Sequence, residues 1–217
     1  MYQQFFKRLI DIVLSAVGIV ITAVPMLIIA FITRIDTPGS AIFHQKRYGI
    51  HKEYFYILKF RSLPQTASPD KPTHLMDDKI ELTRWQRFLR KSSLDELPQL
   101  FCIFCGTMSI VGPRPALWNQ DDLIAERDRY GANDVKPGLT GWAQINGRDE
   151  LEIPVKAKLD GEYALILNQG GLKAFGMDVR CFFGSVLPVL RRDGVVDGAS
   201  GLPDNNSESF RQTDGKP

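Results

Sequence analysis

The chain has 217 residues, which is long enough to bury a sizeable core and favours one principal domain with appendages. Its 27 lysines and arginines stand against 25 aspartates and glutamates, and a net charge of only +2 argues against nucleic-acid binding by bulk charge. The three cysteines argue against a disulfide framework and favour reducing, cytoplasmic surroundings.

The first predicted element is a membrane segment. Residues 12–32 read IVLSAVGIVITAVPMLIIAFI and contain no charged side chain. At about 1.5 Å of helical rise per residue, this run is long enough to cross a bilayer core of about 30 Å. A cleaved secretory signal is disfavoured, because the run is long and no clear cleavage site follows it.

Pro25 predicts a kink in that segment, because an internal proline removes a backbone hydrogen bond and clashes with the preceding turn. Neither arm of the kinked helix alone crosses about 30 Å of hydrocarbon. Basic residues flank both ends of the segment. Lys7 and Arg8 precede it, and Arg34, Lys46, Arg47 and Lys52 follow it. By the positive-inside tendency both ends look cytoplasmic, but from the residues alone a kinked spanning helix and a re-entrant hairpin both stay open.

The next elements are a hairpin and a group of helices. The aromatic phrases AIFHQKRY and EYFYILKF flank GIHK, which predicts a β-hairpin over residues 41–60. Residues 64–79 are rich in proline and polar groups and predict a loop. Helices are expected over 82–104, with an interruption near Pro98, and over 121–130. The phrase KPGLTGWAQINGR predicts a structured loop without a regular element.

Near the C-terminus six apolar residues recur at helical spacing, namely Val179, Phe182, Phe183, Val186, Val189 and Leu190. This amphipathic helix packs on the core or lies in a membrane interface, and both readings stay open. The fold class expected is mainly α with a small β-hairpin, an α+β chain. Its expected parts are a membrane-anchoring helix over 1–35, a globular part over 36–198, and a polar, disordered tail over 199–217.

Asp95 and Glu96 are the candidate catalytic pair, in the phrase SLDELPQL. On an intact helix two adjacent acids are usually solvated surface. Pro98, however, disfavours helical angles at Leu97, so the acids are expected at a helix break that directs both into one pocket. Two close carboxylates raise each other's pKa or hold a cation, and Mg2+ prefers such oxygen ligands together with substrate phosphates.

Four basic residues are candidate phosphate ligands. Lys59 and Arg61 lie in LKFRSL, Arg114 in VGPRPA and Arg148 in INGR. Arginine forks onto phosphate oxygens in a bidentate way, and lysine acts as a point charge. Two prolines fix the backbone of Arg114, and a glycine turn precedes Arg148, which favours a functional role for both.

Other chemistry has weaker signals. Cys102 and Cys105 lie among apolar residues without a second ligand pair, which predicts a buried structural pair. His44, His51 and His74 show no ligand spacing and are expected at the surface. No glycine-rich phosphate loop occurs in the sequence, so the common ATP and dinucleotide readings have little support.

Taken together, six phrases give the chain a resemblance to the monotopic phosphoglycosyl transferases, a bacterial sugar transferase family. These phrases are FKRLIDIVLS, KFRSL, RFLRKSSLDELPQLF, MSIVGPRPA, RYGANDVKPGLTGWAQINGR and KLDGEY. They occur in the family's order and cover most of residues 5–165. Some positions depart from the family's pattern, namely Val24 before the proline, Gln86, Thr107 and the phrase FCIFC.

The resemblance implies transfer of a phosphosugar from a UDP-sugar to a polyprenol phosphate such as undecaprenyl phosphate, with release of UMP. It implies Asp95 as nucleophile and ligand of the Mg2+ cofactor, and Glu96 as its partner in proton handling or orientation. It also implies a re-entrant membrane helix kinked at Pro25, interfacial helices, contact with membrane lipid, and the cytoplasmic face of the inner membrane. A homodimer stays open, as do the sugar and the pathway.

Two other functions fit the sequence less well. A catalytically inactive membrane scaffold for glycan assembly is disfavoured by the intact Asp95 and Glu96. A glycosyltransferase that moves only the sugar would release UDP, so identifying the nucleotide product separates it from a phosphosugar transferase.

Overall fold

The computed structural model describes residues 2–64, 81–147 and 151–191, and within these it is mostly helical. The helical elements after a short π-helical turn at Tyr2–Phe6 are α1 (Lys7–Asp36), α2 (Arg84–Ser92), α3 (Gln99–Cys105), α4 (Asp121–Asp128), α5 (Trp142–Ile145), α6 (Ile153–Gln169) and α7 (Gly171–Arg191). Single 3-10 turns cover Ile50–Lys52, Leu94–Glu96 and Ala132–Asp134. The mainly helical prediction is confirmed for these residues; the predicted loop and tail lie largely or wholly outside them.

The predicted β-hairpin is confirmed. Strands β1 (Ile42–Tyr48) and β2 (Tyr54–Phe60) pair antiparallel, with Tyr48 opposite Tyr54 and Phe43 opposite Lys59. Side chains alternate between the faces of a strand, so Lys59 shares a face with Ile57 and Arg47. This face carries part of the candidate site.

A second, parallel sheet was not expected from the sequence. Strand β3 (Ser109–Val111) pairs with β4 (Gly138–Thr140), and β4 and α5 lie in the stretch predicted as a loop without regular structure. That prediction is wrong. Gly138 allows the pairing, because a Cβ there would lie 2.1 Å from the Gly112 backbone nitrogen.

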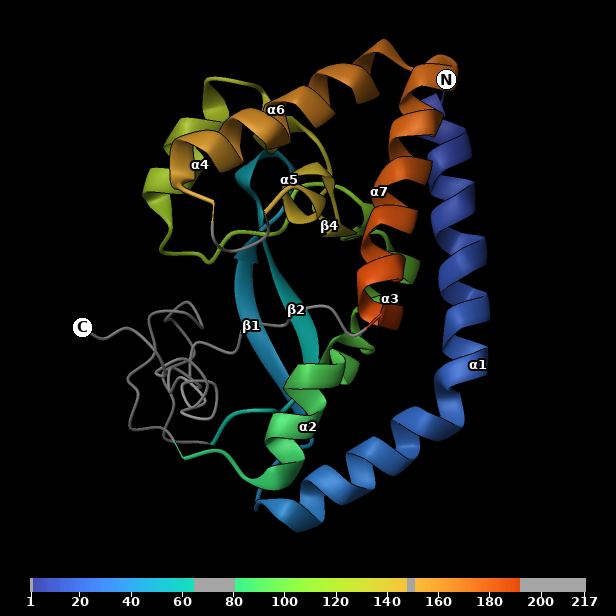
Figure 1. The fold of residues 1–217 in the computed structure, drawn as a ribbon, viewed down its shortest axis with the longest axis vertical. Coiled ribbons are helices and arrows are strands. Elements are labelled where there is room, and N and C mark those ends of the chain that lie inside the picture. Colours follow the sequence, from blue (N-terminus) through green and yellow to red (C-terminus); the bar gives the residue numbers. More distant parts are fainter. Residues whose placement is uncertain (1, 65–80, 148–150, 192–217) are drawn as a thin grey trace, which may run out of the picture.

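Helix α1 is long and apolar, and it contains Pro25. Figure 1 shows α1 running along one side of the molecule and then turning sharply toward α2. A proline inside a helix lacks the N–H for the i−4 carbonyl and its ring displaces that carbonyl, which accounts for the bend. Among the described residues α1 is the one helix long and apolar enough to cross a membrane by length and composition.

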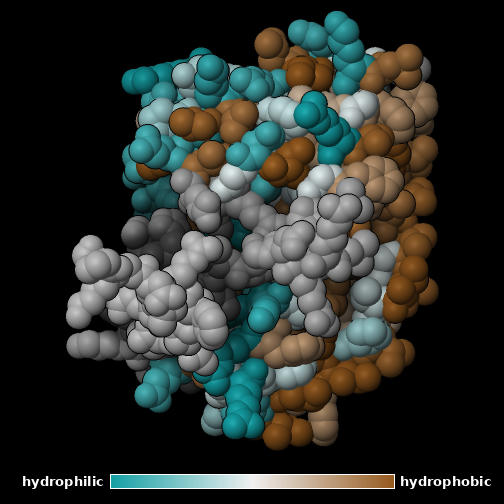
Figure 2. Space-filling view, viewed as in Figure 1, coloured by the Kyte–Doolittle hydropathy of each residue, from teal (hydrophilic) through white to brown (hydrophobic). Residues whose placement is uncertain are grey.

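The outer side chains of α1 form an apolar surface. Val20, Ile21, Leu27, Phe31 and Ile35 are each more than two-thirds exposed. Figure 2 shows hydrophobic side chains along the right and lower margins of the molecule, where Figure 1 places α1. A soluble monomer rarely exposes a continuous apolar surface of this kind, so α1 offers a surface suited to contact with a membrane or with another protein.

Buried polar contacts fasten the beginning of α1 to the rest of the protein. Lys7 Nζ lies 2.8 Å from Asp178 Oδ2 on α7, and the backbone N–H of Ile110 donates to Asp11 Oδ1 over 2.9 Å. Arg8 donates to two carbonyl oxygens at the end of α3. Lys7 and Arg8 therefore bind within the protein, which weakens their use as topology signals in the sequence.

The apolar residues that recur at helical spacing in α7 are divided between the core and the surface. Cys181 is fully buried and Phe182 packs against the main hydrophobic core, whereas Phe183 is 55% exposed and Val179 lies at the surface. The prediction that this helix packs on the core is confirmed for part of it, and the membrane-interface alternative stays a prediction. The core beneath it also contains Tyr163 of α6, whose hydroxyl donates to the Val111 carbonyl.

Candidate active site

The turn between α2 and α3 positions the two candidate carboxylates. Helix α2 ends at Ser92, its C-cap Ser93 has a left-handed φ of 55°, and a 3-10 turn over Leu94–Glu96 follows. Leu97 keeps helical angles, with φ −52° and ψ −38°, and Pro98 leads into α3. The predicted helix break is confirmed, but its cause is the left-handed Ser93, and the expectation that Pro98 distorts Leu97 is wrong.

Glu96 forms two ion pairs through the same oxygen. Its Oε1 lies 2.8 Å from Lys59 Nζ and 3.2 Å from Arg114 Nη2. Burial by itself would raise the pKa of the Glu96 carboxyl, but Lys59 and Arg114 outweigh burial and hold that pKa well below its usual range. Glu96 is therefore an anion that fixes two cations beside each other.

Asp95 lies in a different environment. The residue is only 8% exposed, and its Oδ2 accepts a 2.9 Å hydrogen bond from the Ser62 hydroxyl. Burial raises the pKa of Asp95 above its usual value, the charge of Lys59 opposes that rise, and Glu96 adds to it. Two adjacent carboxyls thus have pKa values shifted in opposite directions, which is a common mark of a functional site.

A basic pocket lies beside this pair. It is lined by Arg47, Ile57, Lys59, Glu96, Gln99, Arg114 and Pro115. Its lining has three cations and one carboxylate, so it favours an anionic ligand. Asp95 is not among the described lining residues, although the charge of Lys59 acts on both carboxyls. The structure therefore places Glu96 in the pocket and Asp95 next to it, where the sequence prediction expected both to line one pocket.

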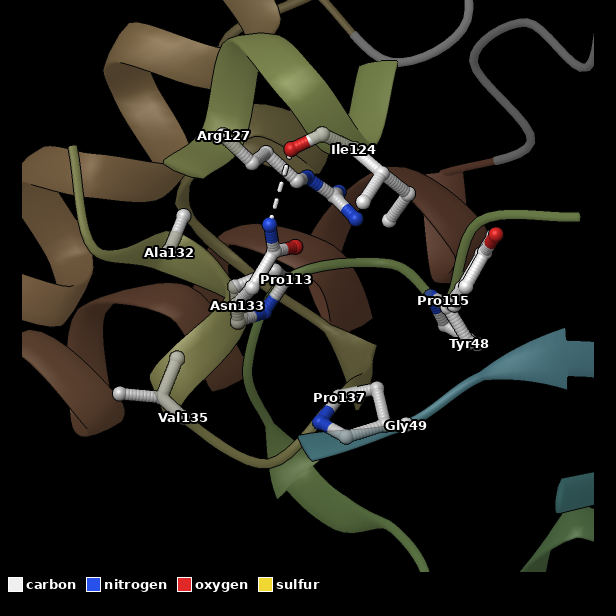
Figure 3. Close-up of a pocket in the computed structure, with 10 residues that line it drawn as sticks. All are labelled: Tyr48, Gly49, Pro113, Pro115, Ile124, Arg127, Ala132, Asn133, Val135 and Pro137. Atoms are coloured by element: carbon white, nitrogen blue, oxygen red, sulfur yellow. Dashed lines mark hydrogen bonds between the residues drawn. The ribbon is translucent and has the colours of Figure 1, made fainter. Parts of the chain in front are cut away.

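A buried ion pair outside the basic pocket contacts the backbone of Arg114. Arg127 on α4 donates from Nε and Nη2 to Asp160 Oδ2 on α6, over 2.9 and 2.6 Å. The same Nη2 donates to the Arg114 carbonyl oxygen over 2.9 Å. Figure 3 shows Arg127 beside Pro113 and Pro115, around a small second pocket. The Arg127–Asp160 pair thus fixes the backbone that carries the Arg114 guanidinium.

The sequence gives one sign of this arrangement. In the phrase KLDGEY, Gly161 follows Asp160, and a Cβ on Gly161 would lie 2.2 Å from Tyr130 Cβ. Only glycine permits this approach of α6 to the end of α4, which brings Asp160 to Arg127. Because a glycine inside a helix is costly, Gly161 indicates that another segment packs closely there, but it does not identify that segment.

Arg61 does not belong to the pocket as expected. Its buried guanidinium donates to the carbonyl oxygens of Thr37 and Pro38, over 2.5 and 2.7 Å, and to the Thr37 hydroxyl. These groups lie at the end of α1, where helix carbonyls lack intrahelical partners. The structure therefore gives Arg61 a role at the end of α1, away from the described lining of the basic pocket, and its predicted role in substrate binding stays a prediction.

We expect Arg61→Met to lower the free energy of unfolding by about 1.5–3 kcal/mol, because the part-buried hydrogen bonds to the Thr37 and Pro38 carbonyl oxygens lose a charged donor. Chemical denaturation in detergent measures this. Arg34→Met is the matched control, since Arg34 is an exposed arginine at the same helix end and its loss should change stability by less than about 0.5 kcal/mol. Equal losses for the two variants would contradict the role given to Arg61.

The remaining sequence predictions have mixed outcomes. Cys102 is buried but Cys105 is exposed, so the predicted buried pair is wrong for Cys105. His44 and His51 are at the surface, as expected. Arg148 and His74 lie outside the described residues, so their predictions stay predictions.

Several residues of the site were missed by the sequence reasoning. They are Ser62, Arg90, Gln99, Arg127 and Asp160. Arg90 lies close enough for its charge to lower the pKa of Asp95. Ser62, Arg90 and Gln99 stand within a few positions of residues that were singled out, so that proximity was the available signal. Arg127 and Asp160 are brought to the site only by the packing of α4 on α6.

No cluster of three or more His, Cys, Asp or Glu side chains suited to a metal occurs in the described part of the chain. Asp95 is the carboxyl suited to a metal, because Glu96 is already bound to two cations. A single protein carboxylate together with substrate phosphates is a usual coordination of Mg2+. These residues therefore fit a Mg2+ ion that arrives with a phosphate ligand.

A model of the bacterial sugar transferase family matches residues 2–192. The "uncharacterized sugar transferase EpsL" of Bacillus subtilis (strain 168) is 35% identical over 192 residues, which cover 88% of this chain and 91% of that protein.

Two further relatives have names that specify a reaction. The UDP-glucose:undecaprenyl-phosphate glucose-1-phosphate transferase of Klebsiella pneumoniae is 36% identical over 76% of this chain and 36% of its own length. The undecaprenyl-phosphate galactose phosphotransferase of Salmonella typhimurium is 34% identical over 88% of this chain and 42% of its own length. The matched part thus spans less than half of either relative. With the family match over nearly the whole described structure, the chain belongs to the bacterial sugar transferase family.

Proposed function

We propose that this protein transfers a phosphosugar from a UDP-sugar to a polyprenol phosphate such as undecaprenyl phosphate, releasing UMP. The observation that carries the proposal is the pair of adjacent carboxyls with different surroundings: Glu96 is held as an anion by Lys59 and Arg114, and Asp95 is buried beside it without a direct cation among the described ion pairs. The names of the relatives support a UDP-sugar donor and an undecaprenyl phosphate acceptor.

The reaction follows as two displacements at one phosphorus. An oxygen of Asp95 attacks the sugar-bearing phosphorus, the bond from that phosphorus to the bridging oxygen breaks, and UMP leaves with that oxygen. Asp95 then carries the phosphosugar as an acyl phosphate. A phosphate oxygen of the polyprenol phosphate attacks the same phosphorus, the bond to Asp95 breaks, and the free carboxylate returns with polyprenyl-diphosphate-sugar as product.

The other residues prepare this site by position and charge. Lys59 and Arg114 neutralise phosphate oxygens, and Glu96 holds both cations in place. Because its pKa is held well below the usual range, Glu96 stays ionised at neutral pH, which favours its orienting role over proton transfer. Ser62 orients Asp95 through Oδ2.

Mg2+ belongs to the proposal as cofactor. Asp95 would hold it together with the diphosphate of the donor, and the ion would supply charge neutralisation at the phosphate oxygens. Burial supports this, because a carboxyl that is costly to ionise gains more from a nearby cation than a solvated one.

The membrane part of the proposal is a re-entrant α1 that dips into the cytoplasmic leaflet of the inner membrane. The bend in α1 and its exposed apolar side chains support it. Single cysteines at Phe5 and Ser40, which are both exposed, test it in a Cys105→Ser background. Labelling of both from the cytoplasmic side is expected, and labelling from opposite sides would refute re-entry.

The nucleotide product tests the reaction. Membranes with the full chain, polyprenol phosphate and Mg2+ are incubated with UDP-glucose, UDP-galactose and UDP-N-acetylgalactosamine in turn. We expect UMP from at least one donor. UDP as the product would indicate an ordinary glycosyltransferase, and absence of any nucleotide product from a wide donor panel would favour a membrane scaffold.

The pH dependence gives a further prediction. Asp95 must be ionised to attack, and its pKa is raised, so UMP release should be lost on acidification at a pH above the ordinary aspartate value of about 3.9. Lys59 lowers that pKa, so Lys59→Gln should move the midpoint to still higher pH. The measurement is the burst of UMP released without polyprenol phosphate. The acceptor is left out because its phosphate group titrates and would add a pH dependence of its own. An unmoved midpoint would contradict this role of Asp95.

A further inference from the structure

Gln99 occupies an unusual position at the basic pocket. It is the first residue of α3, it is only 2% exposed, and it lines the pocket together with Lys59 and Arg114. Its Nε2 is buried and has no hydrogen-bond partner among the described residues. A buried amide donor without a partner is costly, and native proteins keep few of them.

The surroundings of Gln99 Nε2 determine which kind of group could accept a hydrogen bond from it. Nε2 carries two N–H groups and accepts nothing, so its partner must be an acceptor. The pocket lining has an excess of cations, so a ligand there is anionic. Oxygen acceptors that carry negative charge and suit Lys59, Arg114 and a neutral amide together are those of a phosphoryl group.

We propose that Gln99 is a substrate-binding residue whose Nε2 donates a hydrogen bond to a phosphoryl oxygen of the reacting substrates. This rests on the proposed function and adds to it a neutral donor beside the two cations. The phosphoryl oxygen has two sources, the diphosphate of the nucleotide sugar and the phosphate of the polyprenol lipid, and the experiment separates them.

The test uses Gln99→Met, which keeps the unbranched shape and removes the amide. The control is Ser109→Ala, because Ser109 Oγ is likewise buried without a described partner but lies in β3, outside the pocket lining. Each full-length variant is assayed in membranes for the UMP burst without acceptor and for turnover with polyprenol phosphate. The second variant is Gln99→Glu, which replaces the donor with an acceptor. Melting temperatures of all variants are measured in parallel.

We expect Gln99→Met to lose about ten- to hundredfold in rate with an unchanged or higher melting temperature, since it also removes an unsatisfied buried donor. Gln99→Glu should lose at least as much, whereas Ser109→Ala should keep the wild-type rate. A loss in the burst assigns the oxygen to the nucleotide sugar, and a loss confined to turnover assigns it to the lipid phosphate.

Wild-type rates in both assays for both Gln99 variants would overturn the inference while leaving the transferase intact. A wild-type protein that releases no UMP from any donor would instead overturn the proposed function. A rate loss in Gln99→Met that only parallels a fall in melting temperature, with Gln99→Glu at the wild-type rate, would also overturn the inference, because it would show a packing role.

Discussion

Asp95→Asn is expected to abolish UMP release, with a loss of at least about a thousandfold. Asparagine has almost the shape of aspartate, but its amide is a poor nucleophile and cannot form the acyl phosphate. The folded protein should tolerate the change, because burial disfavours the charge of Asp95 and the Ser62 hydroxyl can still donate to the amide oxygen. A melting temperature at or above the wild-type value is therefore expected.

Glu96→Gln is the matched comparison for Asp95→Asn. It removes the neighbouring charge and releases Lys59 and Arg114 from their shared anion. We expect a smaller loss in rate than for Asp95→Asn and a lower stability, since two part-buried cations lose their partner. The reverse order, in which Glu96→Gln loses all activity and Asp95→Asn keeps it, would transfer the nucleophile to Glu96.

The second large effect is expected at the buried pair behind Arg114. Asp160→Asn leaves the Arg127 guanidinium without its counter-ion in a site where both side chains are almost fully buried. Breaking such a pair costs about 3–5 kcal/mol in the free energy of unfolding. The rate of UMP release should fall too, because Arg127 also holds the Arg114 carbonyl.

A double variant separates the two consequences. Arg127→Met with Asp160→Leu replaces both charges by apolar groups, which often restores the stability lost by the single change. The hydrogen bond to the Arg114 carbonyl stays absent, so the rate should remain low while the melting temperature recovers. A double variant with the wild-type rate would show that the pair does not position Arg114.

The sequence predicted the elements that depend on local patterns. The apolar run of α1, the alternating aromatic strands of the hairpin and the acidic turn at Asp95 each follow from neighbouring residues. Lys59 and Arg114 were also predicted, and they meet at Glu96, although they lie 37 and 18 positions from it in the chain. Their phrases contain structural constraints, a strand end and two prolines, that mark a fixed position.

What the sequence could not predict depends on contacts between distant segments. Arg61 looked like a second phosphate ligand because it lies near Lys59, but it follows the end of β2 and its guanidinium donates to carbonyl oxygens at the end of α1. The parallel pairing of β3 with β4 joins two three-residue strands that are too short for a recognisable pattern. Ser93 has a left-handed conformation that serine rarely adopts. The sequence prediction therefore attributed the helix break at Asp95 and Glu96 to the nearby Pro98.

The central claim is that Asp95 carries the phosphosugar. The direct measurement is the intact mass of the full-length protein after incubation with Mg2+ and the UDP-sugar that yields UMP, without polyprenol phosphate, followed by peptide mapping. The account predicts one added sugar phosphate per chain, on the peptide that contains Asp95, with one equivalent of UMP released and discharge on addition of polyprenol phosphate. An unmodified protein that still turns over with acceptor, or an adduct on a different residue, would contradict it.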